Sequence, residues 1–109
     1  MVRALGATRF LAAGRPMRFV LLYESLSESR AKIPVHYPAH AARCEEFHDA
    51  RSLVAIGVFT DADDDGPRSM NVFKTRAAAE EFVGGDPFVL NGIVSRWSLP
   101  EWNEVFLDR

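Results

Sequence analysis

Residues 53–74, LVAIGVFTDADDDGPRSMNVFK, contain two apolar runs on either side of an acidic stretch. The runs 53–60 and 69–74 are rich in β-branched and aromatic residues, which favour strands. Asp, Gly and Pro in the connection 61–67 favour a turn, so the chain reverses there and the two strands pair as a hairpin. The rest of the predicted fold is arranged around this hairpin.

A strand and a helix precede the hairpin, and a helix and a strand follow it. The apolar run 18–23 predicts the first strand, and the helix-forming residues 38–50 predict the first helix. After the hairpin we expect a helix over 76–83, a last strand over 93–99, and a tail from Pro100 onward. The order β-α-β-β-α-β predicts a ferredoxin-like α+β fold, an antiparallel four-stranded sheet with both helices on one face.

The predicted strands carry apolar residues on both faces. In the first strand, Phe19, Leu21 and Tyr23 alternate with Val20 and Leu22. Two helices cover only one face, and burying a large aliphatic side chain contributes about 1.5 to 3 kcal/mol. We therefore expect a second copy to cover the other face, which makes the protein a homodimer packed sheet to sheet.

Composition excludes several classes of protein. The 109 residues are 48% hydrophobic and 26% charged, which excludes intrinsic disorder, and no apolar run reaches the roughly 20 residues that span a bilayer. A formal net charge of −2 makes nucleic acid an unexpected partner. The single cysteine, Cys44, cannot form an internal disulfide, so we expect a cytoplasmic protein. Residues 1–16 are expected to be a non-structural extension, with the domain over 17–109.

Several short motifs, in this order, resemble those of the YCII-related family, whose members are dimeric α+β barrels. The resemblance covers 17–106 and implies a homodimer with a pocket between sheet and helices. It also implies an active site built on His40 and Asp86. The motifs that carry it are RFVLLYE at 18–24, Pro38-Ala39-His40, Gly85-Asp86-Pro87-Phe88, and LPEWNEVF at 99–106.

The sequence departs from the family pattern in two places. Ala50-Arg51-Ser52 stands where the family commonly has a glycine between the first helix and the second strand. Gly57-Val58-Phe59 stands where the second strand usually ends in Gly-Pro. The second change alters a wall of the implied pocket, so no relative's substrate is carried over.

His40 and Asp86 are the candidate catalytic pair. A histidine with a pKa near 6.5 can serve as general acid or base at neutral pH, and Asp86 would fix its tautomer and stabilise its charged form. An aspartate before a proline is also a common helix start, in which the carboxylate caps the helix. The two roles are compatible, since one carboxylate oxygen can cap while the other accepts from the imidazole.

Tyr23, Phe88 and Arg96 are the candidate substrate-binding residues. Tyr23 ends the first strand and would offer its phenol to a carbonyl or enol, and Phe88 would supply aromatic surface. Arg96 is the nearest anion-binding candidate in the last strand. Core packing is the alternative interpretation for the two aromatic residues, and an exposed surface charge is the alternative for Arg96.

His36, His40, Cys44 and His48 repeat every four residues, as metal ligands on a helix sometimes do. A four-residue step lags by about 40° per repeat, so the four side chains drift around the helix. Cys44 falls on the apolar stripe and is expected in the core. We therefore predict no metal site and no cofactor.

Two classes of function remain. The first is a cofactor-independent lyase or isomerase in which a His-Asp pair acts on a small cyclic or aromatic carbonyl or enol compound. The second is a homodimer that binds a small ligand in the same pocket without turnover. Neither nucleic acid nor a membrane is expected as a partner.

Overall fold

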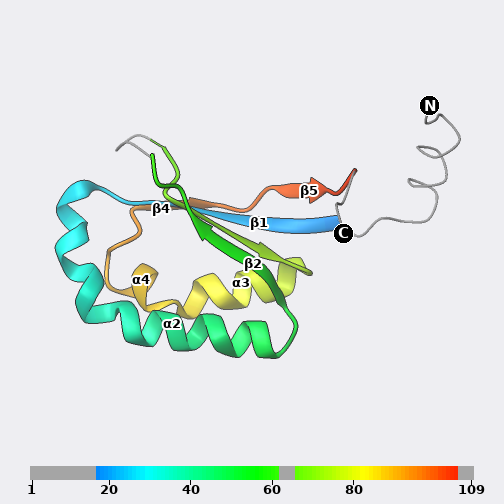
Figure 1. Cartoon of the computed structure of the whole chain (residues 1–109), viewed down its shortest axis with the longest axis horizontal. Coiled ribbons are helices and arrows are strands. Elements are labelled where there is room, and N and C mark those ends of the chain that lie inside the picture. Colours follow the sequence, from blue (N-terminus) through cyan, green and yellow to red (C-terminus); the bar gives the residue numbers. More distant parts are fainter. Residues whose placement is uncertain (1–16, 62–65, 106–109) are drawn as a thin grey trace, which may run out of the picture.

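The computed structural model describes residues 17–61 and 66–105, so the expected extension 1–16 and part of the acidic turn lie outside the described residues. Single strands and strand pairs are separated by helices along the chain (Figure 1). In order, the elements are β1 (Met17–Glu24), the 3-10 helix η1 (Ser27–Lys32), α2 (Ile33–Asp49), β2 (Leu53–Val58), β3 (Ser69–Phe73), α3 (Arg76–Gly85), α4 (Pro87–Leu90), β4 (Arg96–Ser98) and β5 (Glu101–Asn103).

The strands form one antiparallel sheet in the order β2-β3-β1-β4, and β5 also pairs with β1. The helices α2, α3 and α4 lie on one side of this sheet (Figure 1). The predicted hairpin is β2 and β3, with Val58 opposite Ser69. The predicted α+β fold is therefore confirmed, with five strands in the sheet where four were expected.

The fifth strand comes from the segment predicted to be a tail. The expected strand 93–99 is shorter, because the backbone N–H groups of Ile93 and Val94 donate to the carbonyl of Phe88 instead of joining the sheet. Pro100 separates β4 from β5, and its carbonyl accepts from Val20 N–H at 3.0 Å. Both short strands therefore pair with the single long strand β1.

The first helix begins earlier than predicted. It starts at Ile33, contains Pro38, and follows η1, where a polar loop was expected. Pro34 lies in the first turn, where a backbone N–H has no intrahelical partner. Pro38 lies in the second turn and removes one intrahelical hydrogen bond near the helix start. The proline pair is thus tolerated inside the helix.

The turn after α2 contains Ala50-Arg51-Ser52, where the family commonly has a glycine. Arg51 has a φ of 63°, in the left-handed region that favours glycine. The backbone N–H of Arg51 donates to His48 and that of Ser52 donates to Phe47, which is the Schellman arrangement of a helix end. Arg51 therefore occupies a glycine conformation at the C-terminus of α2.

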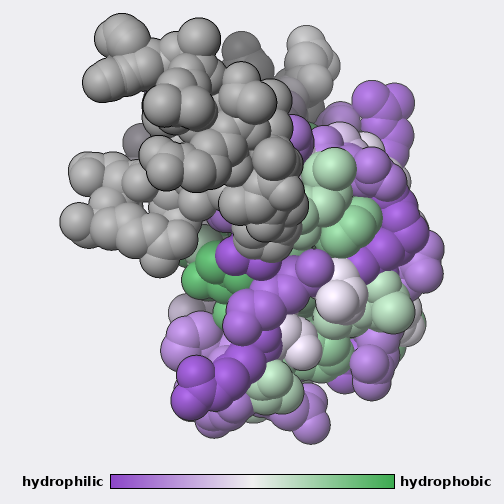
Figure 2. Space-filling view, turned by 90° about the vertical axis from the view of Figure 1, so that its right-hand side faces the viewer, coloured by the Kyte–Doolittle hydropathy of each residue, from purple (hydrophilic) through white to green (hydrophobic). Residues whose placement is uncertain are grey.

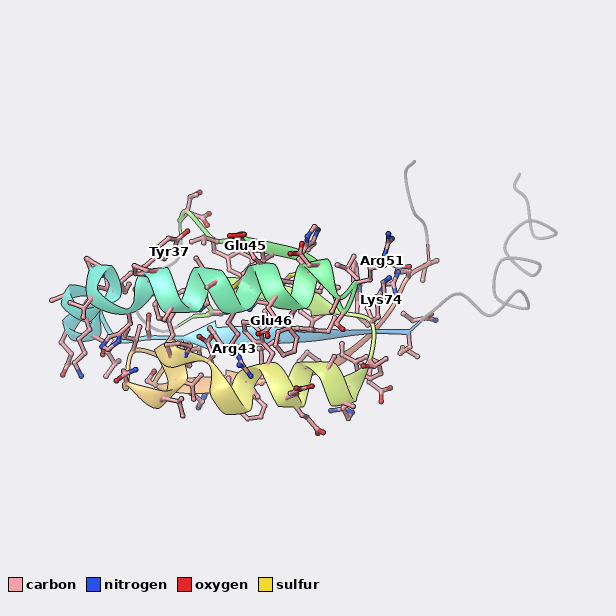
Figure 3. The ribbon with its side chains drawn as sticks, turned by 90° about the horizontal axis from the view of Figure 1, so that it is seen from below. Tyr37, Arg43, Glu45, Glu46, Arg51 and Lys74 are labelled. Carbon is pink, nitrogen blue, oxygen red and sulfur yellow. The ribbon has the colours of Figure 1, made fainter. Side chains whose placement is uncertain are left out.

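The core lies between the sheet and the two long helices. Phe47 of α2 and Phe82 of α3 meet edge to face with ring centroids 5.2 Å apart, over Phe73 of β3. Arg43 of α2 reaches across to α3, where its guanidinium donates to the carbonyls of Glu81 and Phe82 at 2.8 and 3.1 Å (Figure 3). The helices are therefore joined by both aromatic packing and polar contacts.

The face of the sheet opposite the helices is also apolar. In the described ranges, no helix covers this face (Figure 1). None of the described helices is long and apolar enough to cross a membrane. The strand registers place on the uncovered face the residues Val20, Leu22, Ala55, Met70, Val72 and Trp102, which we call the open sheet face.

Hydrophilic side chains predominate among the described residues at the end where α2 finishes and α3 begins (Figure 2). His48, Asp49 and Arg51 are exposed there. The candidate site lies toward the opposite end of the helical layer, where α4 meets the first half of α2 (Figure 1).

Candidate active site

A cavity of about 420 Å³ lies between the sheet and the start of α2. Its walls are mostly apolar and include Ile56 and Val58 of β2, Phe88 of α4, and Ile93. The polar side chains of His40 and Asn71 also line it. Small-molecule sites are commonly concave, largely apolar and about 300 to 1,000 Å³ in volume, with a few placed polar groups. This cavity fits that description.

His40 lies in the second turn of α2 and is buried. Its Nδ1 is 2.8 Å from Oδ1 of Asp86, and its ring stacks on Phe88 with centroids 3.9 Å apart and planes 5° apart. The other ring nitrogen, Nε2, is 3.6 Å from Sγ of Cys44, one turn further along α2. The imidazole is therefore fixed in orientation by a carboxylate, an aromatic ring and a thiol.

Asp86 is fully buried at the junction between α3 and α4 and accepts from three donors. Its Oδ2 accepts from the Tyr23 hydroxyl at 2.6 Å. Its Oδ1 accepts both from His40 and from the backbone N–H of Phe88, at 2.8 and 3.1 Å. Asp86 caps α4 as predicted. The prediction that one oxygen caps the helix while the other accepts from His40 is wrong, because Oδ1 does both and Oδ2 accepts from Tyr23.

The electrostatics of the site favour a charged His40. Burial lowers the pKa of the imidazole, but the hydrogen bonds with Asp86 and Cys44 and the Asp86 charge outweigh burial and raise it to about 9. Burial and the hydrogen bond to Asp86 raise the pKa of Tyr23 well above its usual range. At neutral pH the site therefore holds an imidazolium, and Tyr23 stays a neutral phenol that donates to the carboxylate.

The structure brings four of the five predicted site residues together. Tyr23, His40 and Phe88 line the cavity, and Asp86 lies behind them. Arg96 is not part of this group, because its side chain is 78% exposed and pairs with Glu24 at 3.3 Å. Arg96 is therefore a surface charge, which was the alternative interpretation of this residue.

Sequence reasoning did not select Asn71, Arg30 or Arg68, all of which line the cavity. Asn71 did leave a signal, since it is the one amide in the otherwise apolar stretch Met70–Phe73. Arg30 and Arg68 gave no such signal in the sequence, because each lies in a polar segment, and only the fold brings that segment to the cavity. Within 17–61 and 66–105, no three His, Cys, Asp or Glu side chains form a cluster that could hold a metal ion.

Residues 17–103 match the profile of the YCII-related domain. This chain belongs to the YCII-related family. No curated protein sequence matches this family member. Among solved structures, it is similar to 5-chloro-2-hydroxyhydroquinone dehydrochlorinase from Burkholderia phenoliruptrix in complex with 2,5-dihydroxybenzoquinone. The TM-score is 0.58 at 19% sequence identity, over 80% of this chain and 93% of that chain.

The similarity to the dehydrochlorinase shows a shared fold. Within that fold, this YCII-related protein places an imidazole with a raised pKa at the wall of an apolar cavity of about 420 Å³. An imidazolium can donate a proton to a substrate oxygen or carbon, or stabilise an enolate or phenolate as its charge develops. These are the steps that the arrangement of His40 and Asp86 can support.

Proposed function

We propose that this protein is a cofactor-independent lyase or isomerase that acts on a small cyclic or aromatic carbonyl or enol compound. The observation that carries the proposal is the buried contact of 2.8 Å between His40 and Asp86 at the wall of an apolar cavity. Asp86 acts as a positioning residue, because it contacts the imidazole and lies behind the cavity wall.

The charge state of His40 determines the order of the proposed steps. The imidazolium first donates a proton to a carbonyl oxygen or an unsaturated carbon of the substrate. The neutral imidazole then accepts a proton from a neighbouring C–H or O–H bond of the same ring. In an isomerisation His40 ends as the imidazolium it began as, and no proton is gained or lost overall. In an elimination the leaving group departs as an anion with its bonding electron pair, the second proton passes from His40 to solvent, and the proton first donated returns from the product to His40, so the ring loses one proton and one anion overall and the imidazolium is restored.

Nε2 is the nitrogen that exchanges this proton, since Asp86 holds Nδ1. Its contact with Cys44 Sγ is 3.6 Å, and a thiol is a weak hydrogen-bonding group. A ligand oxygen that approaches Nε2 therefore competes against a weak partner. The structurally similar dehydrochlorinase is named for a chlorinated hydroxyhydroquinone, which supports a ring substrate here and leaves the departing group open.

The test is a comparison of wild type with His40→Asn on small lactones, enols, phenols and haloaromatics. General acid–base catalysis contributes about 10²- to 10⁴-fold, so turnover should fall by that factor while ligand binding persists. A ligand at 100 times its dissociation constant adds about 2.7 kcal/mol of stability, which a thermal-shift assay detects. His48→Asn, an exposed change in the same helix, is the matched control. Full turnover in His40→Asn would contradict the mechanism.

A ligand-binding protein without turnover is the second candidate, and the charge state of His40 favours it. An imidazole with a pKa of about 9 is mostly protonated at neutral pH, so it would attract an anionic ring and donate its proton less readily than an ordinary histidine. In that case wild type and His40→Asn would both fail to consume a ligand that shifts the melting temperature of wild type. The same experiment therefore separates the two candidates.

We also propose that the protein is a homodimer in which two open sheet faces pack together. The support is the apolar character of that face, with Ala55 and Trp102 exposed on it. Cytoplasmic location remains a prediction, based on the single cysteine, which is free. The prediction that neither nucleic acid nor a membrane is a partner also remains untested.

A further inference from the structure

Asn71 is a buried polar side chain that has no polar partner among the residues that the structure describes. It lies in the middle of β3, between Leu21 of β1 and Ile56 of β2, and is only 1% exposed. Neither Oδ1 nor Nδ2 makes a hydrogen bond to any residue within the described ranges. Asn71 also lines the cavity, on the side formed by the sheet.

An unpartnered amide in this position lowers the stability of the free protein. Buried polar groups in folded proteins nearly always have hydrogen-bond partners, and each exception calls for an explanation. An apolar residue of the same size would pack against Leu21 and Ile56 without that penalty. A ligand that supplies the missing partners would explain why an amide stands here.

We propose that Asn71 is a specificity-determining residue that binds two oxygen functions on adjacent carbons of a ring. A carboxamide presents one acceptor, Oδ1, beside two donors on Nδ2. A vicinal diol or an α-hydroxy carbonyl can donate to Oδ1 through its hydroxyl and accept from Nδ2 through its second oxygen. A single oxygen, or two oxygens on opposite sides of the ring, would leave half of the amide unpaired.

This inference rests on the proposed function, because it assigns a substrate class to the same cavity. The two polar side chains used here come from different layers, with Asn71 in the sheet and His40 in α2, and Arg30 and Arg68 line the same cavity. The apolar walls Ile56, Val58 and Phe88 suit the faces of the ring. With its oxygen pair on Asn71, the ring would present another part of its edge to His40.

The test uses catechol, whose hydroxyls are adjacent, and its isomer hydroquinone, whose hydroxyls are opposite. We expect wild type to bind catechol about 10- to 100-fold more tightly, the usual effect of leaving a buried hydrogen-bonding group unpaired. Asn71→Leu should bind the two isomers equally, with the affinity for catechol lowered by the same factor. Asn103→Leu, the same change at an exposed asparagine of β5, should retain the preference for catechol.

A second measurement separates a ligand-binding role from a structural one. Asn71→Leu should melt at the same temperature as wild type or higher, because it removes a buried polar group. A clear fall in melting temperature would show that the amide is bonded in the free protein and would overturn the proposal. Equal affinity for the two isomers in wild type, or no binding of catechol, would also overturn it.

Failure of the proposed function gives a different result from failure of this inference. If the protein is only a binding protein, wild type will consume no ring compound, yet it will still prefer catechol over hydroquinone through Asn71. If Asn71 has no role in recognition, turnover will still depend on His40, but the preference for catechol will be absent. The binding assay requires no turnover.

Discussion

The Asp86 carboxylate connects three parts of the chain. It accepts from Tyr23 of β1, from His40 of α2 and from a backbone N–H of α4. Two of the donors are neutral, and the third carries a proton that the carboxylate itself helps to retain. The charge of Asp86 is therefore the property that makes His40 a proton donor.

Asp86→Asn removes this charge and keeps the geometry. The asparagine oxygen can still accept from His40 and cap α4, and its amide can donate to the Tyr23 oxygen. Burial is the largest influence on the pKa of His40 and lowers it, so without the carboxylate we expect a pKa below 6.5 in place of about 9. The measurement is an NMR titration of the imidazole carbons. A value that stays near 9 would mean that another group keeps His40 charged.

The raised pKa of His40 also predicts how stability depends on pH. The pKa is about 9 in the folded protein and 6.5 in the unfolded chain, so the folded state holds the proton more tightly. The stabilisation is complete below pH 6.5 and is lost as pH rises through about 9. Its size is up to about 3 kcal/mol, since each pKa unit corresponds to about 1.4 kcal/mol.

Urea unfolding between pH 6 and pH 10 measures this effect. Wild type should lose stability over that range. His48→Asn should lose as much, because the His48 side chain is 70% exposed and lies 3.9 Å from the exposed Asp49. His40→Asn should show a much flatter profile. Parallel profiles in all three proteins would assign the pH dependence to other groups.

Whether a residue's role could be predicted from the sequence depended on how far that role relies on the tertiary fold. His40 and Asp86 could be selected from the resemblance and from the chemistry of imidazole and carboxylate. The bond from Tyr23 could not, because it depends on where the end of β1 meets the α3–α4 junction. Arg96 failed as a site residue because the pairing of β4 with β1 places it beside Glu24.

At the scale of elements, the end of α2 carries a local strain. Arg51 adopts a left-handed conformation, which costs a residue with a side chain roughly 1 to 2 kcal/mol. The two backbone hydrogen bonds of the turn, from Arg51 and Ser52, keep it in that conformation.

Arg51→Gly should therefore stabilise the protein. Glycine takes this conformation freely but has more freedom in the unfolded chain, so we expect a gain of about 1 kcal/mol in the free energy of unfolding. Arg51→Ala, which removes the charge and keeps the strain, is the control and should change stability little. Chemical denaturation measures both, and a gain in the alanine variant equal to that in the glycine variant would assign the effect to the lost charge.

Element types were predicted better than element limits. The hairpin, the two long helices and the strand β1 follow from residue periodicity and composition, which are local properties. The tail residues Glu101–Asn103 become a strand only because β1 is long enough to pair with both β4 and β5. Such pairing depends on the length of a distant strand, which local sequence does not reveal.

At the scale of the whole molecule, the proposed homodimer would cover the open sheet face, on which Ala55 and Trp102 are exposed while Val20 and Val72 are already buried. We expect light scattering at micromolar concentration to give twice the chain mass of 12.2 kDa. Ala55→Arg places a charge on the exposed part of this face and should give a monomer of lower stability. Ala42→Arg, an exposed change in α2, should remain a dimer. A wild-type mass equal to one chain would contradict the proposal.

The shared oxygen of Asp86 also has a consequence for the history of such proteins. Selection for a stable fold alone would preserve Asp86, because it caps α4, and would keep a hydrogen-bond donor to that carboxylate at position 40, although the donor need not be a histidine. If the proposed catalysis were no longer needed in a gene duplicate, position 40 could change to another hydrogen-bond donor before Asp86 changed. We therefore expect descendants without catalytic activity to keep the aspartate, lose the histidine, and still fold around the same cavity.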